Sequence, residues 1–326
     1  MEICDSDLKK LCRTDVTLTP LHINTLLYNL LVGLKYLHSA GIYHRDLKPA
    51  NCLVNQDCAV KICDFGLSRA LGEDHLEKRV APTRIPSSGD RPDEDGQESL
   101  EGLRPHRQPR RHLTGHVVTR WYRAPELILL QENYTSAIDM WSVGCIYAEL
   151  IGMLEGTRVE DRGPLFPGSS CFPLSPDHKH RTDYRYHTRG KHDQLNMIFN
   201  LLGTPSEEHI QELERDDARR YILCFARRDG EGLAARFSHV EPDAVDILSN
   251  LLRFSPKERL GVSQALEQPL FADIRDPQKE RTSDVLISLD FEREPDLDES
   301  LLRKYICKEM QRHRHDDAEN VRRGGG

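Results

Sequence analysis

Two short polar runs carry the side chains with the clearest catalytic chemistry. His44-Arg45-Asp46-Leu47-Lys48-Pro49-Ala50-Asn51 precedes a short predicted hairpin, and Asp64-Phe65-Gly66 follows it directly. Carboxylate and amide oxygens are hard ligands that suit Mg²⁺, and a lysine can face a phosphate. A lone Asp or Asn is normally a turn or cap residue. Such residues on both flanks of one hairpin instead favour phosphoryl transfer, which needs groups held in line and charge neutralised.

The two runs match the signature of a protein kinase catalytic loop and its metal-binding triplet. Thr119–Glu126 supplies a third motif, which ends in Ala-Pro-Glu. Asp139–Gly144 supplies a fourth, the buried helix that anchors such loops. Because the four motifs occur in the expected order, the sequence resembles a protein kinase.

The resemblance assigns roles to the polar residues. Asp46 is expected to orient the acceptor hydroxyl and take its proton, while Lys48 faces the γ-phosphate of ATP. Asn51 and Asp64 are expected to hold Mg²⁺. The predicted catalytic residues are Asp46, Lys48, Asn51, Arg45 and Thr119.

Longer motifs narrow the resemblance to the MAP kinases, a subfamily of the CMGC serine/threonine kinases. The shared features are the runs at 165–168, 202–205 and 120–123. The Thr-x-His lip at 114–116 is most similar to MAP kinases of apicomplexan parasites, as are stretches 117–150 and 166–176. The resemblance runs from Met1 to about Met310, apart from a low-complexity insertion. It implies transfer of the ATP γ-phosphate to serine or threonine in protein substrates, with Mg²⁺ as cofactor.

The same resemblance implies a regulatory site. Thr114 resembles the activation-lip threonine, and Arg45 with Arg69 resembles the pair that grips its phosphate through charge-assisted bonds. His116 stands where most MAP kinases carry a phosphorylated tyrosine, so one phosphosite is expected to suffice. Thr119 resembles the residue that bonds the catalytic loop.

Two further features concern the substrate and the stability of the lip. The resemblance implies that Val117, Val118, Arg120 and Arg123 shape a pocket for the residue that follows the target Ser or Thr. In this family that residue is a proline. Glu126 and Arg259 resemble a buried ion pair that ties the lip to the helical lobe.

The first residues resemble the hinge between the two kinase lobes, with Met1 in the place of the residue that guards the adenine pocket. The expected nucleotide-binding residues are Glu2, Cys4, Asp7, Leu53, Lys48 and Asp64. No glycine-rich loop, strand lysine or paired helix glutamate precedes His44. We therefore expect the N-terminal β lobe to be missing from this chain.

The rest of the sequence supplies elements that position these groups. Apolar residues at three-four spacing over 23–37, opened by Thr19-Pro20 and closed by Gly41, predict a helix. Cys52–Val54 and 59–63 predict the hairpin. Ile138–Ile151 is apolar nearly all round and predicts a buried helix. Further helices are predicted at 193–202, 243–252, 263–266 and 301–312.

The predicted fold class is therefore mainly α: the large lobe of the kinase fold with a small β-hairpin. Residues 1–11 are predicted to be a hinge remnant, 12–271 the large lobe, and 272–326 a MAP-kinase-like C-terminal extension with a flexible tail. Within the lobe we predict a disordered insertion at about 72–113 and an irregular loop at about 160–192. Residues 273–280 are interpreted either as an acidic docking patch or as a solvated loop.

Composition narrows the remaining classes. The chain has 326 residues, 38% of them hydrophobic and 30% charged, with a formal net charge of −8. No apolar run is long enough to span a membrane, and neither a membrane nor nucleic acid is an expected partner. Nine cysteines without a CxxC pair predict a reducing compartment, the cytosol or nucleus. The expected partners are protein substrates and an upstream activating kinase, with the protein itself a monomer.

Two functional hypotheses remain. Intact HRD, DFG and APE elements favour an active serine/threonine MAP kinase. The missing phosphate loop favours a truncated, non-catalytic lobe that acts as a docking, scaffold or competitor module. Retention of Asp46, Lys48, Asn51 and Asp64 argues for the first, because a docking module has no chemical use for them.

Overall fold

The computed structural model describes residues 3–70, 120–171, 190–289, 291, 294 and 297–323, with residue 161 and residues 313–323 lacking described side chains. Described residues up to 287 belong to one compact unit and those from 288 to a second. The predicted insertion and most of the predicted irregular loop lie outside the described residues. Within the described part, no helix is long and apolar enough to cross a membrane.

The long helix before the catalytic loop, α2 (Pro20–Ser39), forms where the spacing predicts it. The Thr19 hydroxyl oxygen caps it by accepting a hydrogen bond from the backbone N–H of His22 at 3.3 Å. The helix ends at Ala40, and Gly41 takes a positive φ of 76° that turns the chain. Its buried face is apolar and consists mainly of Ile23, Leu26, Leu27, Leu30, Leu31 and Leu34.

Two small sheets flank the catalytic loop. The predicted hairpin is confirmed as β3 (Cys52–Val54) and β4 (Val60–Ile62), paired antiparallel. The hairpin is not alone, however, because β1 (Ser6–Asp7) pairs with β3 as a third strand. A second sheet joins β2 (Ile42–Tyr43) to β5 (Arg69–Ala70). The sequence prediction of a single hairpin was incomplete, since two-residue strands have no readable periodicity.

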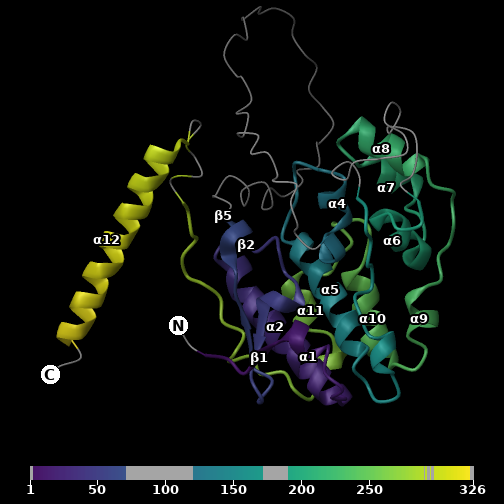
Figure 1. Cartoon of the computed structure of the whole chain (residues 1–326), viewed down its shortest axis with the longest axis horizontal. Coiled ribbons are helices and arrows are strands. Elements are labelled where there is room, and N and C mark those ends of the chain that lie inside the picture. Colours follow the sequence, from purple (N-terminus) through teal and green to yellow (C-terminus); the bar gives the residue numbers. More distant parts are fainter. Residues whose placement is uncertain are drawn as a thin grey trace, which may run out of the picture. The chain divides into compact units, whose positions relative to one another are not determined.

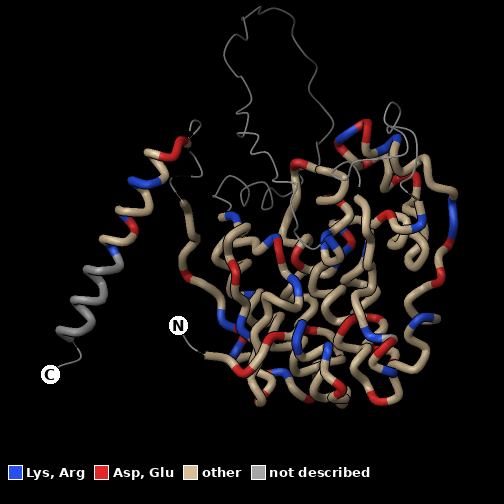
Figure 2. Tube along the Cα trace, in the orientation of Figure 1, with Lys and Arg blue, Asp and Glu red and all other residues tan. Residues whose placement is uncertain are grey.

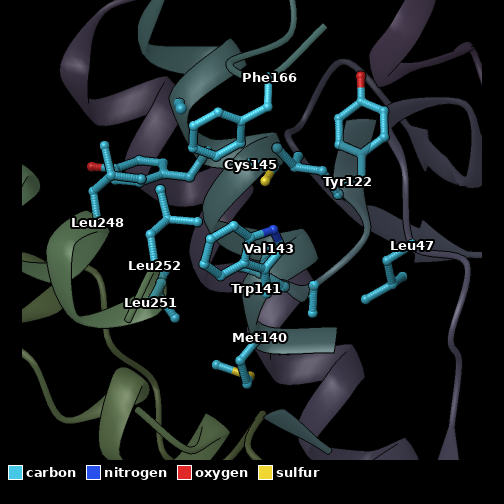
Figure 3. Packing of buried hydrophobic residues seen from close by; sticks show 14 of the residues in the cluster. Leu47, Tyr122, Met140, Trp141, Val143, Cys145, Phe166, Leu248, Leu251 and Leu252 are labelled. Atoms are coloured by element: carbon cyan, nitrogen blue, oxygen red, sulfur yellow. The ribbon is translucent and has the colours of Figure 1, made fainter. Parts of the chain in front are cut away.

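The helix α5 (Ala137–Ile151) lies in the core of the first unit, and all fifteen of its residues are buried, as predicted. Figure 3 shows Trp141 and Phe166 within this packing, and their rings stack with centroids 5.9 Å apart. α10 (Pro242–Leu251) packs against α5 so closely that a Cβ at Gly144 would lie 2.8 Å from Leu252 Cδ2. Glycine is therefore required there by the close approach of the two helices.

The remaining elements of the first unit are short (Figure 1). The predicted helices at 193–202, 243–252 and 263–266 are confirmed as α6 (Gln194–Leu202), α10 and α11 (Val262–Leu266). The other described helices of this unit are α1 (Leu8–Leu11), α4 (Pro125–Ile128), α7 (Glu207–Gln211), α8 (Asp216–Leu223) and α9 (Leu233–Arg236). Five 3₁₀ turns are described: η1 (Pro49–Asn51), η2 (Phe65–Leu67), η3 (Arg120–Tyr122), η4 (Val159–Asp161) and η5 (Pro269–Phe271). Figure 2 shows acidic and basic residues interspersed along the trace of this unit.

The second unit contains α12 (Glu299–Arg323), which begins near the predicted position and extends beyond it. The Tyr305 hydroxyl donates a hydrogen bond to Glu294 Oε1 at 2.6 Å, and the Phe291 ring lies 6.2 Å from that of Tyr305. These contacts fix the start of the helix to the segment before it.

Candidate active site

The catalytic loop is held by one buried carboxylate on α5. Asp139, which is fully buried, accepts hydrogen bonds from the backbone N–H of His44 at 2.9 Å and of Arg45 at 2.8 Å. The His38 ring, at the end of α2, contacts the same carboxylate at 2.9 Å. A buried ionised acceptor makes strong, directional bonds. The backbone that carries Asp46 is thereby fixed to the core helix, as the motif predicts.

His44 connects this loop to the residue before the metal triplet. Its Nδ1 accepts a hydrogen bond from the backbone N–H of Asp46 at 3.3 Å, and its Nε2 lies 2.9 Å from the Cys63 carbonyl oxygen. With Nδ1 as acceptor, the proton resides on Nε2 and is donated to Cys63. The buried imidazole thus sets the spacing between the loop and Asp64, and its ring also packs 5.3 Å from that of Phe65.

The predicted catalytic groups meet at Asp46. Lys48 Nζ donates to Asp46 Oδ2 at 2.5 Å, and Asn51 Nδ2 donates to the Asp46 carbonyl oxygen at 3.0 Å and to Oδ2 at 3.4 Å. A carboxylate oxygen that receives both donors is held in one orientation, with its partners beside it. The structure therefore brings Asp46, Lys48 and Asn51 together as one constellation.

Asp64 lies across the hairpin with a left-handed backbone, φ 67°, and is exposed. A Cβ at Gly66 would lie 3.3 Å from Asp64 Oδ1, a tight contact that glycine avoids. The side-chain amide nitrogen of Asn51 donates to Asp46, which leaves the side-chain oxygen, Oδ1, for a ligand. Within the described residues, no group of three or more His, Cys, Asp or Glu side chains could hold a metal. The donor set nevertheless fits Mg²⁺, which is commonly bound by one or two protein oxygens together with substrate phosphates.

Among the predicted nucleotide-binding residues, Asp7 and Leu53 are direct partners across β1 and β3. The Asp7 carboxylate caps α1, since it accepts from the backbone N–H of Lys10 at 2.9 Å. Cys4 is half-buried just before β1, and Glu2 lies outside the described residues.

The Cys63 thiol lies directly before Asp64 in the chain. Burial, and then the negative charge of Asp64, raises the pKa of this thiol, so it stays protonated near neutral pH.

The predicted regulatory arginines both lie at the β2–β5 strand pair. Arg45 has a positive φ of 69°, and its Nη1 donates to the Leu67 carbonyl oxygen at 3.2 Å. Arg69 lies in β5 and pairs with Tyr43 of β2, and Tyr43 precedes Arg45 by two residues. Thr114 and Thr119 lie outside the described residues, as do His116, Val117 and Val118.

The segment after the lip is anchored at three points. Trp121 Nε1 donates to the Gly168 carbonyl oxygen at 3.0 Å, and the Tyr122 hydroxyl donates to Glu149 Oε2 on α5 at 2.7 Å. Glu126 and Arg259 form the buried bidentate pair that the motif predicts, with distances of 2.7 and 3.1 Å.

Sequence reasoning missed two buried groups in these networks. Glu149 lies inside the continuous apolar pattern of α5, and burial raises its pKa. His38 lies in the last turn of α2, where nothing in the spacing marks its contact with Asp139. The side-chain partner of Glu149 lies 27 residues away in the chain and that of His38 lies 101 residues away, so local sequence patterns do not reveal either contact.

The stretch 273–280 was open between a docking patch and a solvated loop. Its buried acid, Glu280, is bound by Lys35 at 3.0 Å and by Arg275 at 2.8 Å. Hydrogen bonds from Arg275, and then from Lys35, lower the pKa of Glu280. This carboxylate therefore ties the segment to α2 rather than presenting a charge to a partner.

Comparisons with known proteins agree with this geometry. The family model for the protein kinase domain matches residues 1–85 and 102–159. Mitogen-activated protein kinase 3 of Arabidopsis thaliana is 37% identical over 308 residues, which cover 94% of this chain and 65% of that protein. Mitogen-activated protein kinase 1 of Oryza sativa subsp. japonica is 36% identical, covering 94% and 61%. Mitogen-activated protein kinase spm1 of Cytospora mali is 36% identical, covering 96% and 60%. The chain thus spans somewhat less than two thirds of the length of these curated relatives.

Proposed function

We propose that this protein is a serine/threonine MAP kinase, and the match to the protein kinase domain model and the similarity to mitogen-activated protein kinases support the proposal. The reaction is transfer of the γ-phosphate of ATP to serine or threonine hydroxyls in protein substrates. We include in the proposal that the residue after the target is proline, because the Arg-Trp-Tyr-Arg run at 120–123 resembles the family's pocket for it.

One observation carries the proposal: the Asp46 carboxylate is held by Lys48 and Asn51 on a loop whose backbone is bonded to Asp139. When bound, Mg²⁺ and ATP supply the transferable phosphoryl group and the cation that offsets its charge. Asp46 Oδ2 then accepts the proton of the acceptor hydroxyl. Lys48 Nζ would face a phosphate of the bound nucleotide, and Asn51 and Asp64 would provide oxygen ligands for the metal.

We extend the proposal to activation by an upstream kinase. Phosphate on Thr114 would add close to two negative charges, and Arg45 and Arg69 are the cations assigned to it by the family resemblance. In support, the β2–β5 pairing places both arginines beside the same small sheet. Thr114→Ala is then expected to abolish activation, whereas unchanged activation would remove Thr114 as the switch.

The reaction is tested on the protein isolated at its natural length. Phosphate transfer from labelled ATP to a Ser-Pro peptide is compared between wild type, Asp46→Asn and Asp15→Asn, an exposed acid that serves as the control. Loss of a general base reduces turnover by 10²- to 10⁴-fold, so Asp46→Asn should reduce kcat about 10³-fold with nucleotide affinity nearly unchanged. Asp15→Asn should match wild type.

Turnover retained in Asp46→Asn would show that the base is wrongly assigned. Absence of transfer in wild type, together with intact nucleotide affinity, would instead favour a docking module.

A further inference from the structure

A cavity of about 370 Å³ lies away from the catalytic loop, at the opposite end of α5 from Asp139. Its walls come from three places: the entry to α2, the last turn of α5 with the turn after it, and the entry to α10. The volume falls within the range of small-molecule sites, about 300–1,000 Å³. The apolar lining residues are Leu18, Ile23, Tyr147, Ile151, Leu154, Val240 and Ala244.

The walls of the cavity are rigid. Ile23, Tyr147, Ile151 and Ala244 are each at most 8% exposed and belong to the packed core. The loop on the other side is tied down as well, since the Leu18 backbone N–H donates to the Met153 carbonyl oxygen at 2.9 Å. A pocket held by secondary structure is preformed, and a ligand does not have to order it.

Two polar groups converge on the apolar walls. The Tyr147 hydroxyl donates to Asn24 Oδ1 at 3.3 Å, and both residues line the cavity. The bond leaves the amide hydrogens of the half-buried Asn24 for a ligand. Thr19, also on the lining, is occupied by capping α2 through His22.

The charged lining residues are acids. Glu155 and Glu241 are exposed, and in the part of the chain that the structure describes neither carboxylate makes a hydrogen bond or ion pair. Glu241 flanks α10 without capping it and lines the cavity together with Tyr147. The lining residues include no Lys or Arg among those described, and besides the two acids their titratable side chains are His239 and Tyr147.

A basic side chain bound to the segment before Thr17 is already engaged. Arg162 Nη1 donates to the carbonyl oxygens of Thr14 and Val16, both at 2.9 Å, just before the lining residue Thr17. Its charge is therefore directed at the backbone that precedes the cavity. The rim left for a ligand is acidic, and its walls are apolar.

We propose that this cavity is a binding site for a small organic cation with an apolar body. The body packs against the half-buried Leu18, Leu154 and Val240, and the ammonium group lies at the rim between Glu155 and Glu241. A carboxylate of the same shape is excluded, because the two acids repel it. The site is independent of the proposed phosphoryl transfer and involves none of its residues.

The test is calorimetric titration of the 326-residue chain with three probes of one shape: 4-phenylbutylamine, 4-phenylbutanol and 4-phenylbutyrate. The amine should bind saturably at one site and more tightly than the alcohol by about fivefold, the upper value for an exposed ion pair. The butyrate should not bind measurably. The preference for the amine should shrink as salt rises from 20 to 500 mM.

Variants locate the site. Glu155→Gln and Glu241→Gln are exposed changes that leave the core intact, and each should weaken the amine two- to fivefold while leaving the alcohol unchanged. Asp243→Asn, an exposed acid in the first turn of α10 that does not line the cavity, is the matched control and should have no effect. Equal binding of the amine and the butyrate, no binding of any probe, or unaltered amine affinity in both Gln variants would overturn the proposal.

Discussion

The catalytic loop and the metal triplet stand on opposite flanks of the same hairpin and are built differently. His44, Leu47 and Asn51 on the loop are buried, and the loop receives two backbone hydrogen bonds from Asp139. The triplet, by contrast, is exposed from Asp64 through Leu67. One half of the site is part of the core, while the other half lies on the surface.

The difference fits the roles that we propose for the two halves. Proton transfer requires Asp46 within a few tenths of an ångström of an acceptor hydroxyl, so a fixed backbone is an advantage. A ligand to Mg²⁺ has to admit phosphates and water, which requires an open face. In this chain a buried carboxylate, Asp139, supplies the rigidity, and the exposed, left-handed Asp64, two residues before Gly66, supplies the open face.

The sharpest way to break the comparison is to truncate one acid from each half. Asp139→Ala leaves the backbone N–H groups of His44 and Arg45 buried without an acceptor, at about 1–3 kcal/mol each. The free energy of unfolding should therefore fall by about 4 kcal/mol in urea denaturation. Asp64→Ala, the exposed counterpart, should lower it by only about 1 kcal/mol, because its left-handed backbone is less favourable for Ala than for Asp. Similar losses in the two variants would contradict the division into a buried and an open half.

A smaller effect is expected where the segment after the lip is tied to the large lobe. Glu126→Gln leaves the buried Arg259 guanidinium without its counter-charge, with neutral acceptors only: the Gln amide oxygen and the carbonyl oxygens of Ala137, Arg253 and Phe254. Unfolding free energy should fall by about 3 kcal/mol, in line with other broken buried pairs. The exposed Glu258→Gln is the control and should be close to neutral. A neutral Glu126→Gln would mean that the pair does not hold this segment.

The smallest effect concerns pH. Burial raises the pKa of Glu149 above its ordinary value of 4.5, so the folded state holds a proton that the unfolded state has released. Between about pH 4.5 and the raised pKa, this residue makes stability fall as pH rises. In Glu149→Gln that decline should be absent while the bond to Tyr122 can persist. Urea midpoints measured from pH 4.5 to 8 test this, and parallel profiles for variant and wild type would refute it.

The predicted active-site residues came from motifs, and the fold elements around them from periodicity. The helices at 23–37 and 138–151 were predictable because their apolar spacing reflects how much of each surface is buried. β1 and the β2–β5 pair were not, since strands of two residues depend on partners elsewhere in the chain. The contact of His38 with Asp139 and the cavity beside Tyr147 also depend on long-range packing, which leaves no local pattern.

Amide hydrogen exchange measures the central claim directly, because it reports the backbone of both halves in one experiment. In the wild-type chain, the amides of His44 and Arg45 should exchange at least about 10³-fold more slowly than those of Phe65 and Gly66. In Asp139→Asn, which keeps the size of the side chain, that protection should fall toward the level of the triplet. Equal exchange in the two halves of the wild-type protein would contradict the account.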